Sequence, residues 1–227
     1  MGSAAPQSEY TQPRSVAASA RVAAFLMELR AQGIRDLTLL QAVERTPRET
    51  FLPPALSPLA YFNVEAPIAC GQTALAPRGL IQRIAVMQPE KKHIVLEIGA
   101  GSGFQTAVLA HLVKRVFSVE RFRTLADRAN ARLSLLGLAN AVVRQGDGAA
   151  GMAQSAPFNR VFINAAVPEI PAAILSQLAD EARVLAPLKR KGETRMVMTQ
   201  FTGGARTETD LGPIAVSPLE KGGAAVL

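Results

Sequence analysis

Three glycines follow an acidic residue near the middle of the chain. The apolar run at residues 95–98 contains Glu97, and Gly99, Gly101 and Gly103 follow it at a spacing of two residues. An apolar run that breaks into glycines is typical of a buried strand turning sharply into a helix. Glycine accepts a positive φ and leaves room for a ligand to approach the backbone. Gly-x-Gly-x-Gly after an acid therefore favours a ligand with a positive charge and ribose hydroxyls, although a tight turn in any α/β protein would look the same.

Two further carboxylates stand where the next two strands are expected to end. Glu120 follows Gly99 by about twenty residues, the distance at which an acid meets the ribose hydroxyls of a bound nucleoside. Asp147, between two glycines, can accept a hydrogen bond from an adenine amino group. Each acid alone would equally suit a helix N-cap or a solvated loop, but together with Glu97 they favour a nucleoside pocket.

S-adenosylmethionine carries a sulfonium, an α-amino group and a ribose, so it suits this set of residues, and no metal is expected. We expect the cofactor to be bound by residues at the three strand ends, namely Glu97, Gly99, Ala100, Gly101, Ser102, Gly103, Glu120, Arg121, Asp147 and Gly148.

Strand-like and helix-like runs alternate along most of the chain. Expected helices cover residues 16–32, 36–45, 78–87, 104–111, 123–136 and 171–178; expected strands cover residues 93–98, 115–120, 141–144, 160–164, 183–187, 195–201 and 212–219. This alternation predicts an α/β fold with a mostly parallel sheet covered by helices on both faces. Ligands bind such sheets at the carboxyl ends of the strands. Residues 1–15 lack apolar periodicity, so we expect a disordered leader followed by a single domain, residues 16–227.

The charge and composition exclude several classes of protein. The formal net charge is +7, but only Lys189, Arg190 and Lys191 form a basic cluster, and aromatics make up 5% of the chain. Nucleic-acid binding usually gathers charge and aromatics on one face, so a solvated surface is favoured and nucleic acid is an improbable partner. No apolar run reaches the roughly 18 residues that a membrane span needs, and residues 1–15 lack the apolar segment of a secretory signal. The single Cys70 excludes an internal disulfide and fits a reducing compartment, so we expect a cytoplasmic protein.

Six stretches of the chain form a more specific pattern: residues 42–51 (AVERTPRETF), 66–73 (APIACGQT), 95–105, 117–121 (FSVER), 146–148 (GDG) and 165–171 (AAVPEIP). Through them the sequence resembles the protein-L-isoaspartate O-methyltransferase family over about residues 21–219. The Pro-Arg-Glu and Gly-Gln-Thr segments lie outside the cofactor motifs and are the more specific signals. The resemblance implies a Rossmann-like methyltransferase fold with extra N-terminal helices, S-adenosylmethionine as donor, and a protein or peptide substrate carrying L-isoaspartyl or D-aspartyl residues. It also implies that residues 16–90 form a helical, substrate-side part and residues 91–227 the cofactor-binding core.

The sequence departs from the family pattern at three places. Leu75 occupies the position of the family's active-site serine, Asn159 replaces an aspartate, and residues 180–182 (Asp-Glu-Ala) replace Pro-Gly-Gly. Loss of the serine concerns function. Thr73 lies two residues earlier, on the same face of an extended segment, and is a candidate substitute hydroxyl.

Methyl transfer to a carboxylate needs no general base, because a carboxyl with a pKa near 4 is already ionised at neutral pH. Catalysis then depends on orientation and on the exclusion of water. Three hypotheses remain: a carboxyl methyltransferase of isoaspartyl type that is impaired by Leu75, a methyltransferase of this family with a different acceptor, and a non-catalytic protein that binds the cofactor or a partner.

Overall fold

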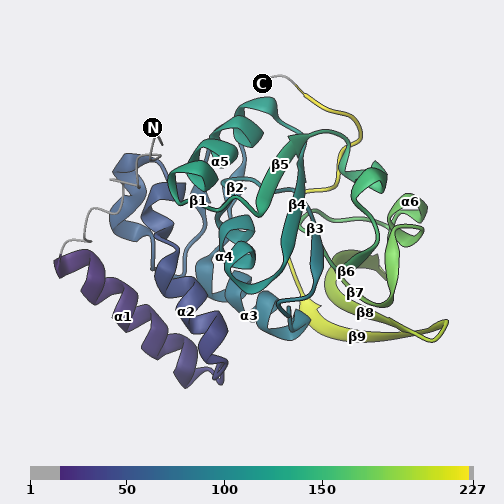
Figure 1. Cartoon of the computed structure of the whole chain (residues 1–227), viewed down its shortest axis with the longest axis horizontal. Helices are drawn as coiled ribbons and strands as arrows, with labels where there is room; N and C mark the ends of the chain where they lie inside the picture. The colour runs from purple at the N-terminus through teal and green to yellow at the C-terminus, as the bar shows by residue number, and fades with distance from the viewer. Residues whose placement is uncertain (1–15, 225–227) are drawn as a thin grey trace, which may run out of the picture.

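A seven-stranded sheet forms the centre of the molecule in the computed structural model, which describes residues 16–224. The strand order is β5-β4-β3-β6-β7-β8-β9 (Figure 1), with β3 at Ile94–Ile98, β4 at Arg115–Glu120, β5 at Ala141–Gln145, β6 at Phe158–Ile163, β7 at Leu178–Arg190, β8 at Glu193–Thr202 and β9 at Ala205–Pro213. The pairs among β5, β4, β3, β6 and β7 are parallel, and β8 and β9 are added antiparallel. The predicted α/β fold with a mostly parallel sheet is confirmed.

Helices contribute to the hydrophobic cores on both faces of this sheet. The described helices are α1 at Val16–Ala31, α2 at Leu37–Arg45, α3 at Pro77–Met87, α4 at Phe104–Leu112, α5 at Arg123–Leu135 and the short α6 at Ala172–Leu175. Residues of α1 to α5 gather in one core with Val95 of β3, whereas Ile174 of α6 joins a second core with Leu96 of the same strand. Neighbouring residues of a strand point to opposite faces, so β3 is buried between the two cores.

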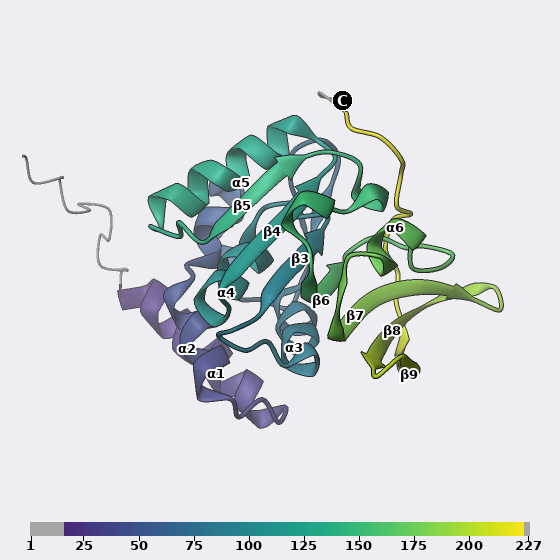
Figure 2. The same ribbon diagram turned by 45° about the vertical axis from the view of Figure 1, so that its right-hand side comes forward.

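The N-terminal part wraps around one side of the sheet and adds the extra helices that the sequence predicts. Helices α1, α2 and α3 lie together beside the sheet (Figures 1 and 2). Asp36 caps α2, because its carboxylate accepts hydrogen bonds from the backbone of Thr38 and Leu39. Between α2 and α3 the chain forms two 3₁₀ helices, at Arg48–Phe51 and Pro54–Leu59, and the two-residue strands β1 (Ala66–Pro67) and β2 (Thr73–Ala74), which pair with each other.

The C-terminal prediction is wrong in one element. A strand was expected at residues 212–219, but the last strand, β9, covers Ala205–Pro213. Gly203 and Gly204 both have a positive φ and form the turn that brings β9 alongside β8. Because β9 is an exposed edge strand of mostly polar residues, it lacks the apolar alternation by which strands are recognised. The segment after β9 instead runs across the carboxyl ends of the strands toward α5 (Figure 2), where the Ala224 carbonyl accepts a hydrogen bond from the Arg123 backbone.

Two neighbouring elements also differ in extent. The helix expected at residues 171–178 is reduced to α6, and β7 begins at Leu178 rather than at residue 183 because Leu178 already pairs with Phe158. Residues 180–182, which replace the family's Pro-Gly-Gly, therefore lie inside a continuous strand. The predicted leader at residues 1–15 lies outside the described residues. No helix within residues 16–224 has the length and apolar character to cross a membrane.

Candidate active site

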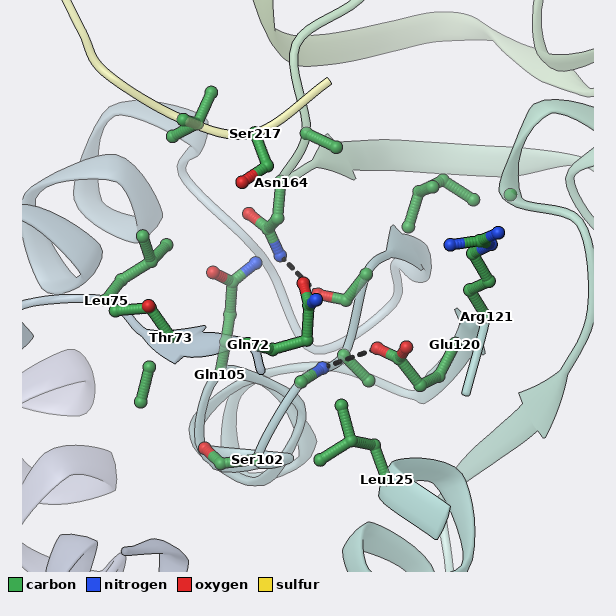
Figure 3. A pocket seen from close by; sticks show the side chains of 18 of the residues that line it. Gln72, Thr73, Leu75, Ser102, Gln105, Glu120, Arg121, Leu125, Asn164 and Ser217 are labelled. Atoms are coloured by element: carbon green, nitrogen blue, oxygen red, sulfur yellow. Dashed lines mark hydrogen bonds between the residues drawn. The ribbon is translucent and has the colours of Figure 1, made fainter. Parts of the chain in front are cut away.

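A cavity of about 710 Å³ lies at the carboxyl ends of β3, β4 and β6. Much of its wall comes from the β1–β2 region, the glycine turn after β3, the segment from the end of β4 to the start of α5, and the segment that follows β9 (Figure 3). Sheets of this kind bind ligands at this edge. Of the residues predicted to bind a cofactor, the lining includes Glu97, Gly99, Ala100, Gly101, Ser102, Glu120, Arg121 and Gly148.

The glycine turn adopts the backbone that its sequence predicts. Gly99, Gly101 and Gly103 all have a positive φ, at 84°, 54° and 87°. At Gly103 a Cβ would lie 2.9 Å from the Cβ of Ala129 on α5, so this glycine allows close packing behind the turn. A Cβ at Gly101 would meet nothing nearer than Ile68 Cδ1 at 3.6 Å, so the requirement at Gly101 comes from its φ and from the cavity beside it.

Glu120 is fixed at the end of β4 by two backbone donors. The Gly101 N–H donates to Oε2 at 2.8 Å, and the Phe122 N–H donates to Oε1 at 3.0 Å (Figure 3). The residue is 5% exposed and lines the cavity. Each carboxylate oxygen has more than one lone-pair site, so Glu120 retains acceptor capacity for a ligand in the cavity. The turn and the acid thus form one hydrogen-bonded unit.

Glu97 is fully buried beneath the glycine turn. Burial raises its pKa to about 7, and the hydrogen bonds from the hydroxyls of Ser118 and Thr106, each 2.5 Å from Oε2, act in the opposite direction. The Asn164 amide lies 3.5 Å from Oε1 and donates to the Gly99 carbonyl at 3.0 Å. A buried carboxylate that lines a cavity is suited to a cationic ligand, because a nearby positive charge favours its ionised form.

Asn164 lines the cavity and was missed as a site residue. The sequence contains the signal that could have identified it, because Asn164 is a polar residue at the carboxyl end of an expected strand. The same rule singled out Glu97 and Glu120.

Of three further predicted cofactor residues, Gly148 and Arg121 line the cavity and Asp147 does not. The Asp147 carboxylate caps the short 3₁₀ helix at Gly148–Ala150 by accepting from the Ala149 N–H at 2.9 Å, and Asp147 is not among the residues that line the cavity. Gly148 does line it, and a Cβ there would lie 2.4 Å from Ile98 Cγ2. Arg121 also lines the cavity and pairs with Glu220 of the segment after β9.

Thr73 and Leu75 form part of the opposite wall of the cavity (Figure 3). The backbone of Leu75 is held by Arg48, whose guanidinium donates to the Leu75 carbonyl at 2.7 Å and also to the Ala60 carbonyl. Arg48 is 1% exposed and lies over the Phe104 ring, 5.6 Å from its centroid. Burial lowers its pKa to about 10, so the guanidinium stays charged at neutral pH. This anchor was missed as well, although Arg48 belongs to the Pro-Arg-Glu segment.

Asn159, the second departure from the family pattern, has a structural role. Its side-chain oxygen accepts a hydrogen bond from the Ile94 backbone at the start of β3, at 2.9 Å. An aspartate can accept the same bond, so this change leaves the site unaltered.

The sheet order, the glycine turn and the acid at the end of β4 define a Rossmann-like methyltransferase. Comparison with known proteins identifies the family. The family model for protein-L-isoaspartate(D-aspartate) O-methyltransferase matches residues 20–221. A protein-L-isoaspartate O-methyltransferase from Xanthobacter autotrophicus is 41% identical over 205 residues, which cover 90% of this chain and 94% of that protein. One from Maricaulis maris is 42% identical over 209 residues, or 91% of this chain and 97% of its relative.

Two solved structures support the fold. A protein-L-isoaspartate O-methyltransferase superposes with a TM-score of 0.77 at 22% identity, over 87% of this chain and 65% of the other. A Plasmodium falciparum protein described as a putative member of the same group, in complex with S-adenosyl-L-homocysteine, gives a TM-score of 0.74 at 17% identity, over 87% and 97% of the two chains. The chain therefore belongs to the protein-L-isoaspartate(D-aspartate) O-methyltransferase family, whose members are S-adenosylmethionine-dependent methyltransferases.

Proposed function

We propose that this protein transfers a methyl group from S-adenosylmethionine to the carboxylate of L-isoaspartyl or D-aspartyl residues in proteins or peptides, and that Leu75 weakens this activity. One observation carries the proposal: two walls of different character border the same cavity. The glycine turn and Glu120 form the wall that we assign to the cofactor, and Thr73 and Leu75 form the opposite wall, which we call the acceptor wall. The family of the chain supports the same activity.

The residues of the first wall fit the proposed cofactor. Glu120 is held by backbone donors and keeps lone pairs for two ribose hydroxyls, which a phosphate-binding turn would not offer. We assign Glu97 Oε1 to the positive charge of the ligand, because the Ser118 and Thr106 hydroxyls engage Oε2 and, within residues 16–224, only the Asn164 amide approaches Oε1, at 3.5 Å. We assign the adenine to the neighbourhood of Gly148 and Asp147, and the backbone of residues 99–103 with Arg121 to the rest of the ligand.

The acceptor needs orientation rather than activation. When bound, the cofactor supplies an electrophilic methyl group; its C–S bond breaks as a C–O bond forms to the acceptor carboxylate, giving a methyl ester and S-adenosylhomocysteine. No proton moves in this step, since the acceptor carboxylate is already ionised. The chain's own residues contribute by holding the acceptor in line and by excluding water from the two opposed charges.

Compared with the serine that the family has at this position, Leu75 lacks a hydroxyl donor and is bulkier. Loss of one hydrogen bond to a charged group costs about 1.5–3 kcal/mol, which is roughly ten- to 150-fold in rate or affinity. Thr73 is exposed on the same wall and is the candidate to supply a hydroxyl in its place. Leu75 is also the observation that favours a second candidate function, methylation of a different acceptor on the same scaffold.

A methyl-transfer assay tests the proposal. The protein is incubated with methyl-labelled S-adenosylmethionine and either an isoaspartyl peptide or the same peptide with a normal aspartyl residue, and base-labile methyl ester is counted. We expect slow, isoaspartyl-dependent esterification. Turnover as fast as that of family members with the serine would contradict the proposed effect of Leu75, and esterification of neither peptide by a protein that binds S-adenosylhomocysteine would favour a different acceptor. A cytoplasmic location remains a prediction from the sequence.

A further inference from the structure

Gln105, the second residue of α4, presents an amide without hydrogen-bond partners to the cavity. The residue is 3% exposed and lines the cavity, yet neither its Nε2 nor its Oε1 has a partner among the described residues. Figure 3 shows its side chain extending from α4 into the space that Thr73 and Asn164 also border. The neighbouring amides differ, because Gln72 donates to the Cys70 carbonyl and Asn164 to the Gly99 carbonyl.

An amide in this state indicates a ligand. A buried donor or acceptor without a partner costs about 1–3 kcal/mol, and such groups are rare in folded proteins. In Gln105 both ends of the amide are unpaired, and the cavity beside them is open to a ligand. The folded protein therefore carries a cost that a bound molecule with an acceptor and a donor would relieve.

Apart from the Thr73 hydroxyl, the acceptor wall described above offers an anionic substrate few donors. The side chain of Leu75 is apolar, and the Arg48 guanidinium is already engaged by the carbonyls of Ala60 and Leu75. Glu120, the proposed ribose ligand, stands on the other side of the cavity from Thr73 and Leu75 in Figure 3. Gln105 extends between these two sides of the cavity in Figure 3.

We infer that Gln105 binds the acceptor directly: its Nε2–H donates to the carboxylate that is methylated, and its Oε1 accepts from a backbone N–H of the acceptor next to that carboxylate. The amide would thus act together with the Thr73 hydroxyl in place of the donor that a serine at position 75 would provide. This inference rests on the proposed function, and it makes Gln105 a specificity-determining residue, because one amide can match both groups only when the carboxylate lies close to a peptide N–H.

The test compares Gln105→Leu, which keeps the approximate size and removes both polar atoms, with Gln41→Leu on the exposed face of α2 as a matched control. For wild type and both variants, kcat and KM for an isoaspartyl peptide are measured at saturating S-adenosylmethionine, the Kd of S-adenosylhomocysteine by calorimetry, and Tm by thermal unfolding. We expect Gln105→Leu to lower kcat/KM for the peptide by about ten- to a hundredfold, with the Kd within twofold and the Tm unchanged or raised. Gln105→Asn should recover part of the activity, and the loss caused by Gln105→Leu should shrink in a Leu75→Ser background, where a hydroxyl shares the donor role.

The outcomes separate the possible failures. A weaker Kd for S-adenosylhomocysteine with an unchanged peptide KM would overturn the inference by assigning the amide to the carboxylate of the cofactor. A fall in Tm would overturn it by showing that Gln105 has a structural partner, and kcat/KM equal to that of wild type would overturn it directly. Absence of isoaspartyl turnover in the wild type, with cofactor binding intact, would overturn the proposed function and this inference with it.

Discussion

Replacement of Glu120 by alanine tests the proposed cofactor site most directly. The wild-type carboxylate accepts the Gly101 N–H at 2.8 Å and the Phe122 N–H at 3.0 Å, and its remaining lone pairs face the cavity. Glu120→Ala removes the ribose acceptor and also leaves the Gly101 N–H without a partner at the ligand-facing turn. A hydrogen bond to a charged group contributes about 1.5–3 kcal/mol, so the Kd of S-adenosylhomocysteine should rise by roughly ten- to 150-fold.

The same variant should lose stability without ligand. Each backbone N–H left unpaired in a buried place costs about 1–3 kcal/mol, so Tm should fall, and the binding loss must be measured well below it. Glu120→Gln separates the two effects, since its amide oxygen still accepts one backbone N–H but the charge is gone; we expect a smaller loss of Tm and an intermediate Kd. Glu44→Ala, on the exposed face of α2, is the matched control for removal of a glutamate.

Isothermal titration calorimetry with S-adenosylhomocysteine measures the Kd of all four proteins at one temperature and salt concentration. A Kd for Glu120→Ala within twofold of the wild type would refute the assignment of Glu120 to the ribose. Failure of the wild type to bind at millimolar ligand would refute the cofactor site as a whole. A loss of the same size in Glu44→Ala would point to a general effect of charge.

Three further changes probe the rest of the cavity. Leu75→Ser should raise esterification of an isoaspartyl peptide at least tenfold by restoring a donor and removing bulk, as measured by methyl incorporation; negligible activity in this variant would favour a changed acceptor. Gly101→Val should abolish S-adenosylhomocysteine binding while circular dichroism shows a folded protein, because a β-branched side chain resists a φ of 54° and occupies ligand space; retained binding would contradict this. Glu97, whose pKa is raised to about 7, should make binding of S-adenosylmethionine tighten as pH rises from about 6 to 8, since the cation needs the ionised form, and Glu97→Gln should flatten this dependence. Between about pH 4.5 and 7 the folded state holds a proton on Glu97 that the unfolded state releases, so the free energy of unfolding without ligand should fall as pH rises in urea titrations, and an absent fall would contradict the raised pKa.

The parts of the fold that the sequence predicts are those with a local periodic signal. The strand β3 and the helix α4 appear within one residue of their predicted bounds, because an apolar run and a glycine turn mark the junction between them. β9 was missed because an exposed edge strand buries little, so its residues carry no alternation. The extent of β7 was missed because its first residues are defined by pairing with β6, a contact between distant parts of the chain.

The residues of the candidate site likewise fall into those that the order of the elements predicts and those that depend on contacts in three dimensions. Glu97 and Glu120 could be singled out because strand ends converge in a parallel sheet, a rule that needs only the order of the elements. The role of Asp147 could not be resolved in this way, since an acid after a strand serves equally as a cap, and capping is the contact that the structure shows. Gln105 could not be found from its sequence position, because what sets it apart is a side-chain amide without a hydrogen-bond partner in the described part of the folded chain.

Arg48 shows why the substitution at position 75 can be studied in isolation. The guanidinium holds the Leu75 segment through the Leu75 carbonyl and the Ala60 carbonyl, and neither bond depends on which side chain stands at position 75. The backbone of this wall is therefore set by a residue 27 positions earlier in the chain, buried against the Phe104 ring. A change from leucine to serine should then alter the polarity and volume of the acceptor wall while the wall itself stays in place. For this reason the response of Leu75→Ser reports on the chemistry of the cavity, and Arg48→Leu, which would release the same carbonyls, should lower activity through the position of the segment whichever residue occupies position 75.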